Sequence, residues 1–463
     1  MAQLQPNASY SVAIRFAAPD SSEVLALVIG GIAVTGGNVQ QVTLIGRDGE
    51  RVIRELTVDA ASEEQAQRII AVVADTEEVE LLESYDRTFR LHAGGKITVD
   101  PKLAFTSQSD LAMAYTPGVG RVCKAIAAEP ERVYDLTVKG NMVAIVTDGS
   151  AVLGLGNLGP EGGLPVMEGK AMLFKAFGGV DAFPICLATQ DTDEIVETVK
   201  RIAPVFGGVN LEDIAAPRCF EIEARLKEEL DIPVFHDDQH GTAIVTLAAL
   251  ENALRLVGKR MADIQIVMNG AGAAGLAVAT LLRTAGATRI TICDSRGIIS
   301  RDRTDLNPQK QAFAIDQKGG LEDAIVGADV FIGVSAPGVL TREMVLSMAP
   351  NRIVFAMANP IPEIQPELVL NDVAVMATGR SDYPNQINNV LAFPGIFKGA
   401  LACRSRTFSS EMFLAAARAI ADLVPAAELS STRIVPSAFD ERVAPAVSAA
   451  VEAEARRQGL ARI

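Results

Sequence analysis

A glycine-rich run between an apolar strand-like segment and an apolar helix-like segment constrains the fold of this chain most. The run, Gly270-Ala271-Gly272-Ala273-Ala274-Gly275, follows a predicted strand over Ile264–Met268 and opens a predicted helix over Leu276–Leu282. Asp294 lies roughly 20 residues beyond the last glycine, at the end of the next apolar run. Such glycines let the backbone approach a pyrophosphate at the helix N-terminus, and the acid can accept hydrogen bonds from ribose hydroxyls. The pattern predicts a Rossmann-type domain that binds NAD.

Apolar runs of strand length recur along most of the chain and alternate with helix-like stretches. Aliphatic residues dominate a hydrophobic share of 49%, whereas aromatic residues make up 5% and tryptophan is absent. This composition is typical of parallel sheets covered by helices rich in alanine and leucine, so we expect an α/β fold. The other predicted strands of this kind are Met142–Thr147, Ala182–Cys186, Ile232–Phe235, Arg289–Cys293, Val330–Val334, Ile353–Ala356 and Val373–Ala377.

The first 85 residues show a different pattern, six short elements in the order βαββαβ. The two middle strands are joined by Arg47-Asp48-Gly49-Glu50, in which Asp-Gly is a strong hairpin signal. This order is ferredoxin-like and resembles an ACT domain, a regulatory module of metabolic enzymes. The first loop, Pro19–Glu23, lacks the glycine through which such modules usually meet a ligand, so a structural or dimerising role is the alternative. The predicted elements are Ser9–Phe16, Glu23–Val34, Gln40–Ile45, Arg51–Asp59, Glu63–Ala74 and Val79–Ser84.

These patterns predict three domains. An ACT-like domain occupies residues 1–85, an α/β domain for substrate and metal occupies 90–246, and a Rossmann-like domain occupies 247–408. The tail, 409–463, is rich in alanine and helical in pattern, and we expect it to pack back on the body of the protein.

Charge and composition exclude several classes of partner. The formal net charge is −15, so the surface as a whole repels nucleic-acid phosphates and anionic lipids. No apolar run reaches the ~20 residues of a membrane span, and the first residues do not resemble a signal peptide, so we expect a cytoplasmic protein. The cysteines are irregularly spaced and odd in number, which predicts reduced thiols: Cys123, Cys186, Cys219, Cys293 and Cys403.

Two pairs of acids end apolar runs in the predicted metal domain. They are Glu212-Asp213 in VNLEDIAAP and Asp237-Asp238 in IPVFHDDQHGTA. Carboxylate oxygens gathered at the ends of neighbouring strands suit Mg²⁺ or Mn²⁺ better than zinc. His236 and His240 share the i, i+4 spacing of a zinc-hydrolase helix, but Asp occupies the position of the required Glu and the stretch follows a strand. A hard-cation site is therefore the favoured interpretation.

Two further residues are candidates for proton transfer. Lys170 lies among apolar residues in GLPVMEGKAMLF, and burial beside a metal would depress the pKa of its ammonium and allow it to act as a base. The ordinary alternative is a surface lysine at the start of a helix. Tyr115, in AYTPGVG, is one of only five tyrosines, and its ordinary alternative is a core aromatic residue.

Seven motifs in order resemble the malic enzyme family in its short prokaryotic form. They are AYTPGVG, TDGSAVLGLGNLGP with PVMEGKAMLF, NLEDI, FHDDQHGTA, NGAGAAG, MANP and GRSDYPNQINNVLAFPG, between about Arg90 and Ala400. An ACT-like N-terminus is similar to one bacterial branch, which is often NAD-dependent. Larger eukaryotic relatives bind the substrate carboxylate with an arginine where this chain has Ser150-Ala151-Val152, so the carboxylate partner is unassigned.

The resemblance implies a role for each matching residue. It implies a metal held by Glu212, Asp213 and Asp238, with Lys170 and Tyr115 as the acid/base pair. It also implies that Asn359 and Asn389 contact substrate and that Asn388 lies near the nicotinamide. The residues expected to bind the dinucleotide are Gly270, Gly272, Ala273, Ala274, Gly275, Asp294 and Asn388.

The resemblance also implies an activity, a metal-dependent oxidative decarboxylation of (S)-malate to pyruvate and CO₂ with reduction of NAD, together with decarboxylation of oxaloacetate. Four alternatives stay open: a malolactic-type enzyme that keeps NADH and releases lactate, an enzyme that prefers NADP through Arg296, a dehydrogenase of another hydroxyacid, and a catalytically silent ligand-sensing protein. A homo-oligomer, dimer or tetramer, is expected.

Overall fold

The computed structural model describes residues 6–463 and divides the chain into two compact units. Unit 1 is Met1–Thr98 and unit 2 is Val99–Ile463. Among the described residues, no helix is long and apolar enough to cross a membrane.

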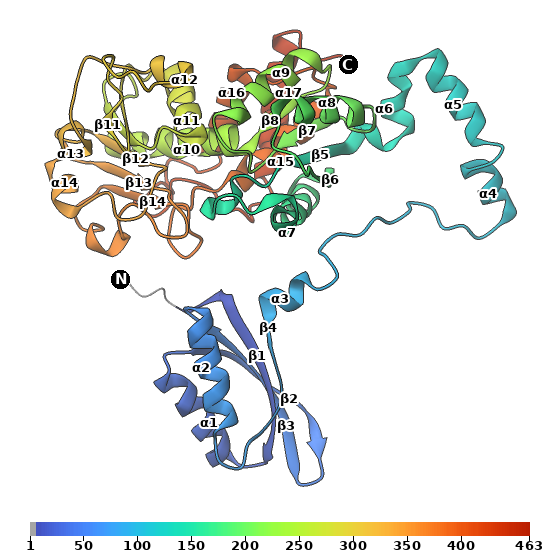
Figure 1. The fold of residues 1–463 in the computed structure, drawn as a ribbon, viewed down its shortest axis with the longest axis vertical. Coiled ribbons are helices and arrows are strands. Elements are labelled where there is room, and N and C mark those ends of the chain that lie inside the picture. Colours follow the sequence, from blue (N-terminus) through green and yellow to red (C-terminus); the bar gives the residue numbers. More distant parts are fainter. Residues whose placement is uncertain (1–5) are drawn as a thin grey trace. The chain divides into compact units, whose positions relative to one another are not determined.

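Unit 1 has the βαββαβ order that the sequence predicts. Its four strands form an antiparallel sheet in the order β2-β3-β1-β4, and the two helices lie together on one face of it (Figure 1). Phe16, Ile14 and Leu56 are fully buried between sheet and helices. The elements are β1 (Asn7–Pro19), α1 (Ser22–Val34), β2 (Asn38–Asp48), β3 (Arg51–Ala60), α2 (Glu63–Ala74), β4 (Glu80–Asp86) and a short α3 (Arg87–His92).

The first sheet of unit 2 is parallel, with strand order β6-β5-β7-β8. Helices α8 and α9 bury one face of this sheet, and α7 contacts β5 and β6. Because the strands are parallel, their carboxyl ends meet at one edge, where ligands of open α/β sheets bind. The elements are β5 (Met142–Thr147), α7 (Gly159–Leu173), β6 (Asp181–Cys186), α8 (Thr192–Ile202), β7 (Gly208–Leu211), α9 (Arg218–Glu229) and β8 (Val234–His236).

The second sheet of unit 2 is the Rossmann-type sheet that the glycine-rich run predicts. Its order is β11-β10-β9-β12-β13-β14, parallel throughout except for the short β11. The elements are β9 (Gln265–Asn269), α11 (Ala273–Thr284), β10 (Arg289–Asp294), β11 (Gly297–Ile298), α12 (Pro308–Gln311), α13 (Leu321–Ala324), β12 (Val330–Gly333), α14 (Arg342–Ser347), β13 (Ile353–Ala356) and β14 (Val375–Thr378).

Helix α10 (Asp237–Val257) joins the two sheets and is almost wholly buried. It packs against α11 of the Rossmann part and against α16 (Ser410–Ala421) of the tail. Helix α17 (Val443–Arg457) packs on both α16 and α15 (Phe393–Ala402). Helix α10 begins directly after β8. One stretch of sequence therefore forms both the carboxyl edge of the first sheet and the helix that supports the second sheet.

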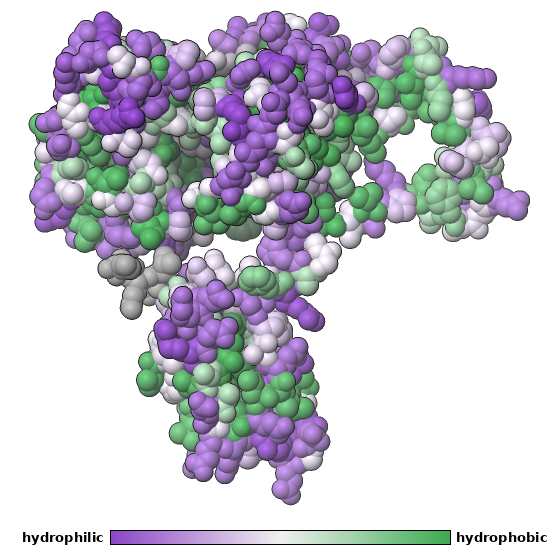
Figure 2. Space-filling model, in the orientation of Figure 1, coloured by the Kyte–Doolittle hydropathy of each residue, from purple (hydrophilic) through white to green (hydrophobic). Residues whose placement is uncertain are grey.

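The start of unit 2 lies within residues 90–246, which the sequence assigns to an α/β domain, but it forms only short helices. Residues 99–138, hereafter the arm, form α4 (Gln108–Ala114), α5 (Val119–Ala128) and α6 (Val133–Leu136). None of these three helices buries a residue. Figure 2 shows apolar residues along the surface of the arm. Periodicity in a sequence indicates a helix but does not reveal what covers it.

The two units should unfold independently. Phe16 is fully buried in unit 1, so Phe16→Ala should lower the free energy of unfolding of that unit by about 3–5 kcal/mol and leave unit 2 unchanged. Calorimetry should show one transition moving to lower temperature. Leu27→Ala, on the 60% exposed Leu27 of α1, is the matched control and should move neither transition. A single transition that shifts as a whole would contradict this division.

Candidate active site

Three carboxylates gather at the carboxyl edge of the first sheet. Glu212 and Asp213 follow β7, and Asp238 lies in the first turn of α10 after β8. Each offers an oxygen within 4.8 Å of the others. Asp213 adopts a left-handed backbone conformation with φ of 54°, and its N–H donates to Asp238 Oδ2 at 2.8 Å. Asn210 Nδ2 donates to Glu212 Oε2 at 2.9 Å. The three side chains named for metal binding are therefore brought together.

The electrostatics of this cluster favour a bound cation. Burial, and then the charge of Asp238, raise the pKa of Asp213 to about 7, and burial raises the pKa of Glu212 well above its ordinary value. Asp213 Oδ2 is buried and accepts no hydrogen bond from the described residues. Clustered carboxylate oxygens without neutral-histidine or thiolate ligands suit Mg²⁺ or Mn²⁺. The residues present thus fit a hard divalent cation.

Lys170 lies beside the cluster, in the last turn of α7 and not at a helix start. Its Nζ is 2.5 Å from Asp237 Oδ2, 2.9 Å from Glu212 Oε1 and 4.4 Å from the centre of the Phe393 ring. Burial lowers the pKa of this ammonium, but the carboxylates of Asp237 and Glu212 outweigh burial and hold the pKa above its ordinary value. The depressed pKa expected for this lysine beside a bound metal stays a prediction.

Asp237 is a site residue that the sequence analysis did not assign. Its side chain is fully buried. Its Oδ2 pairs with the Lys170 ammonium and accepts a hydrogen bond from Asn389 Nδ2 at 3.1 Å. Asn389 Oδ1 also accepts from Thr242 Oγ1 at 3.2 Å. The motif FHDDQHGTA contained the signal, because Asp237 belongs to one of the two acidic pairs. The pairing with a lysine 67 residues earlier could not be read from that motif.

The two histidines of this stretch do not form a zinc site. His240 Nε2 lies 2.6 Å from Glu223 Oε1, and His236 Nδ1 lies 2.7 Å from Gln239 Nε2. His236 Nε2 lies 3.4 Å from Asp238 Oδ2, behind one carboxylate of the cluster. Both rings are therefore engaged as structural partners of acidic or amide groups.

The loop before α7 supports the cluster through its backbone. Ala151 N–H donates to the carbonyl oxygen of Asp213 at 2.9 Å. Ser150 Oγ donates to Asp148 Oδ1 and accepts from Ala215 N–H at 2.8 Å. Arg218 contacts both Asp148 and Ser150, at 2.9 and 3.1 Å. Within the segment Ser150-Ala151-Val152, the buried Ser150 thus holds the loops of the carboxylate cluster together.

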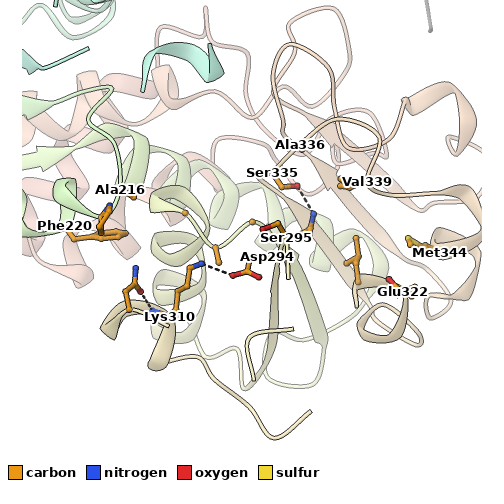
Figure 3. Close-up of a pocket in the computed structure, with 17 residues that line it drawn as sticks. Ala216, Phe220, Asp294, Ser295, Lys310, Glu322, Ser335, Ala336, Val339 and Met344 are labelled. Atoms are coloured by element: carbon orange, nitrogen blue, oxygen red, sulfur yellow. Dashed lines mark hydrogen bonds and ion pairs between the residues drawn. The ribbon is translucent and has the colours of Figure 1, made fainter. Parts of the chain in front are cut away.

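The glycine-rich run lines an open cavity of about 620 Å³ (Figure 3). Gly270 has a φ of 117°, and a Cβ on Gly275 would lie 1.9 Å from the Gly270 carbonyl oxygen, so only glycine fits there. A Cβ on Gly272 would meet open space, and the N-terminus of α11 begins directly after it. The cavity is also lined by Asp294, Ser295, Ala216 and Pro217. The strand, glycine turn and helix N-terminus fit a dinucleotide pyrophosphate.

Asp294 lines this cavity, but its carboxylate is paired with two cations of the same domain. Arg303 donates to both of its oxygens at 2.8 and 2.9 Å, and Lys310 Nζ lies 2.8 Å from Oδ2. Burial raises the pKa of Asp294, but these two cations outweigh burial and hold the pKa well below its ordinary value. The Arg296 guanidinium lies 3.1 Å from Asp305 instead. The sequence pointed to Arg296 near Asp294 and gave no sign of Arg303 or Lys310.

The remaining predicted site residues, Asn388, Asn359 and Tyr115, lie in three different parts of the chain. Asn388 caps the short helix Asn389–Leu391 by accepting from Val390 N–H, next to Asn389. Asn359 follows β13, and its carbonyl oxygen lies 3.3 Å from where a Cβ on Gly154 would be. Tyr115 ends α4 on the arm and is 66% exposed, and its side chain makes no hydrogen bond with the residues described. The structure therefore does not bring Tyr115 to Lys170 of the same chain.

The fold and the site define a class, an enzyme with a Rossmann-type dinucleotide domain and a buried carboxylate site at the edge of a neighbouring parallel sheet. Comparison with protein families agrees. A model described as "Malic enzyme, NAD binding domain" matches residues 239–456, and one described as "Malic enzyme, N-terminal domain" matches 95–191 and 188–227. The chain belongs to the malic enzyme family.

Individual relatives give the extent of the likeness. The chain is 56% identical over 440 residues to an NAD-dependent malic enzyme of Geobacillus stearothermophilus, covering 94% of this chain and 92% of the relative. It is 59% identical over 376 residues to a bifunctional malic/malolactic enzyme of Bacillus subtilis, covering 80% and 92%. A crystal structure of malic enzyme from Pyrococcus horikoshii aligns with a TM-score of 0.77 at 49% identity, over 80% of this chain and 88% of that one.

Protons should compete with the cation for this site. Because the pKa of Asp213 is about 7 in the folded chain, most of its carboxyl groups are protonated at about pH 6 and ionised at about pH 8. Mn²⁺ should therefore raise Tm more at the higher pH, as thermal unfolding would show. Asp238→Asn should abolish the rise, whereas Asp316→Asn, on the surface, should retain it. A rise that is the same at both pH values would contradict the assignment.

Proposed function

We propose that this chain oxidatively decarboxylates (S)-malate to pyruvate and CO₂, with NAD as hydride acceptor and a divalent cation held by Glu212, Asp213 and Asp238. The observation that carries the proposal is the buried Lys170 ammonium bridging Asp237 and Glu212 beside the three-carboxylate cluster. Ala216 and Pro217, which closely follow Asp213, line the dinucleotide cavity. The hydroxyacid and the nicotinamide can therefore meet at one loop.

The bound groups supply the chemistry that side chains lack. When bound at the glycine-rich run, NAD would accept a hydride, and a divalent cation held by Glu212, Asp213 and Asp238 would acidify the C2 hydroxyl of malate and withdraw electrons during decarboxylation. Positive charge held by the cluster would also lower the pKa of the neighbouring Lys170 ammonium, which the cation-free site holds high. Lys170 could then take up the hydroxyl proton.

The residues of the chain position the reacting groups and move two protons. Asp237 and Asn389 fix the Lys170 side chain, so Nζ is held where it can accept the proton of the C2 hydroxyl as the hydride leaves. Loss of the far carboxylate as CO₂ leaves the enolate of pyruvate. Tyr115 Oη then donates a proton to C3 and completes pyruvate. Asn359 and the Asn389 amide are proposed to contact the substrate.

Product analysis separates this proposal from its main alternative. The Bacillus subtilis relative is named as a bifunctional malic/malolactic enzyme, which favours lactate production as the second candidate. With malate, NAD and Mn²⁺, we expect absorbance at 340 nm to rise in step with pyruvate. Lactate without accumulation of NADH would instead establish a malolactic reaction, and no product from malate would favour a ligand-sensing protein.

Lys170 and Tyr115 should fail in different half-reactions. Lys170→Ala should slow malate oxidation about 10²–10⁴-fold, as loss of a general base does. Tyr115→Phe should instead slow exchange of the pyruvate methyl protons with solvent, while sparing more of the hydride step. Deuterium isotope effects on malate oxidation and NMR of pyruvate would measure the two steps. Lys175→Ala, on an exposed lysine shortly after α7, is the control. Exchange lost in Lys170→Ala but unchanged in Tyr115→Phe would reverse the roles.

Coenzyme choice should depend on the pairing of Asp294. A free carboxylate would repel the 2′-phosphate of NADP, but Arg303 and Lys310 already neutralise this one. Asp294→Asn should leave Lys310 without its carboxylate partner and Arg303 paired with Asp305 alone, and so lower the ratio of kcat/KM for NAD to that for NADP by tenfold or more. Steady-state kinetics with both coenzymes would test this, with Asp316→Asn as control. An unchanged ratio would show that Asp294 does not set specificity.

Unit 1 is a compact unit of its own, and its proposed role follows from this. We propose that the ACT-like unit tunes assembly or responds to an effector, because it carries none of the site residues described above. The match to the Geobacillus relative spans 440 residues of this chain and so extends into unit 1.

A further inference from the structure

The start of helix α10 carries polar side chains that the proposed reaction does not use. His236, the last residue of β8, is fully buried, and Gln239 in the first turn of α10 is buried as well. Both belong to FHDDQHGTA, the motif that supplies Asp237 and Asp238. Because they flank two carboxylates of the site, the groups that they contact bear on the site itself.

A buried carboxylate lies behind this turn. Glu223 of α9 is 6% exposed, and its Oε1 lies 2.6 Å from Lys227 Nζ and 2.6 Å from His240 Nε2. Burial raises the pKa of the Glu223 carboxyl, but His240 and Lys227 outweigh burial and hold the pKa below its ordinary value. The His240 ring stacks on Phe413, and Lys227 Nζ lies over the same ring. Glu223 is therefore an ionised acceptor of hydrogen bonds.

The ionised Glu223 fixes the orientation of the Gln239 amide. Gln239 Nε2 lies 3.1 Å from Glu223 Oε2 and 2.7 Å from His236 Nδ1. The NH₂ group of an amide has two N–H donors, whereas the amide oxygen would repel a carboxylate. One N–H of Gln239 therefore donates to Glu223, and the other donates to His236 Nδ1.

This arrangement determines which nitrogen of His236 carries the proton. A neutral imidazole has one N–H donor and one acceptor nitrogen. Because Nδ1 accepts from Gln239, the His236 ring is neutral and its proton lies on Nε2. His236 Nε2 is buried without a hydrogen-bond partner among the residues described, and it lies 3.4 Å from Asp238 Oδ2. The neighbour of this N–H is thus a carboxylate of the three-carboxylate cluster.

Two N–H groups then converge on one oxygen of Asp238. Asp213 N–H donates to Asp238 Oδ2 at 2.8 Å, and His236 Nε2 lies beside the same oxygen. Because the Asp238 side chain is 36% exposed, packing alone does not hold its orientation. Donors on one oxygen fix the plane of a carboxylate and leave the other oxygen for an ion, and such partners behind metal ligands strengthen metal binding.

We propose that Glu223, Gln239 and His236 form a chain of hydrogen bonds that orients Asp238 for the divalent cation. Glu223 turns the Gln239 amide, Gln239 places the His236 proton on Nε2, and this N–H holds Asp238 Oδ2. His236 is a positioning residue, because it acts through Asp238 rather than on the cation or the substrate. The inference rests on the proposed function, in which Asp238 is a ligand of the cation.

Substitutions that differ in where they place an N–H test the role of His236. The amide nitrogen in His236→Gln can occupy the position of Nε2, whereas that in His236→Asn reaches only the position of Nδ1. We expect His236→Asn and His236→Leu to weaken Mn²⁺ binding about 10–100-fold, and His236→Gln to stay within about threefold of the wild-type chain. Electron paramagnetic resonance of unbound Mn²⁺, without malate or NAD, measures the affinity without turnover. His92→Gln, in unit 1, is the matched control and should leave the affinity unchanged.

The tautomer of His236 gives a readout that does not depend on the cation. The chain has only three histidines, so labelling with ¹⁵N-histidine gives three ring systems, and His236→Gln identifies the signals of His236. Long-range ¹H–¹⁵N NMR should show a protonated Nε2 and an unprotonated Nδ1. Gln239→Met keeps the length of the side chain without its N–H groups. It should release this tautomer preference and weaken Mn²⁺ binding, although the proposal places residue 239 two steps from the cation.

The possible results are distinguishable. Unchanged Mn²⁺ affinity in His236→Leu, or a His236 ring protonated on Nδ1, would overturn the positioning role and leave the cation site of the proposed function intact. Equal weakening in His236→Gln and His236→Leu would show that the ring acts by packing alone, and would also overturn it. A wild-type chain that binds no Mn²⁺ would overturn the cation site itself, and this inference with it. Circular dichroism would establish that the variants are folded.

Discussion

The buried ion pair of Lys170 with Asp237 and Glu212 is the interaction on which the site depends. Four carboxylates at one sheet edge would repel each other, and burial makes each unpaired charge costly. Lys170 neutralises part of this charge from α7, with its ammonium over the Phe393 ring. Burial and then the charge of Asp238 raise the pKa of Asp213, and the remaining negative charge, on Asp213 and Asp238 above all, suits the cluster to a divalent cation.

The fold brings this charge cluster to the dinucleotide cavity with few elements. Parallel strands β7 and β8 end at the same edge, so Glu212 and Asp238 meet although they are far apart in sequence. Helix α10 begins at that edge and packs on α11, whose N-terminus follows the glycine turn. Asn389 reaches Asp237 from the segment after β14. Two sheets, one buried helix and one returning loop therefore position the carboxylate cluster, Lys170 and the dinucleotide cavity.

The sequence predicted what local patterns encode. Helix α2 and strand β13 begin and end where periodicity placed them, and Gly275 is required because a Cβ there would strike Gly270. Long-range pairings could not be predicted in this way. Nothing local links Lys170 to Asp237, or Asp294 to Lys310, because such pairs depend on how separate loops converge. The arm was missed for a related reason, since an exposed apolar helix and a buried one share the same pattern.

Electron paramagnetic resonance of Mn²⁺ with ¹⁷O-labelled malate tests the central claim most directly, because it asks whether the three carboxylates hold an ion that contacts the substrate. The account predicts one Mn²⁺ per chain, whose lines broaden when malate labelled at its C2 hydroxyl or C1 carboxylate is added. Bound Mn²⁺ should be lost when Asp213 and Asp238 are both replaced by asparagine. A tightly bound ion whose spectrum does not respond to labelled malate, or that survives the double replacement, would contradict it.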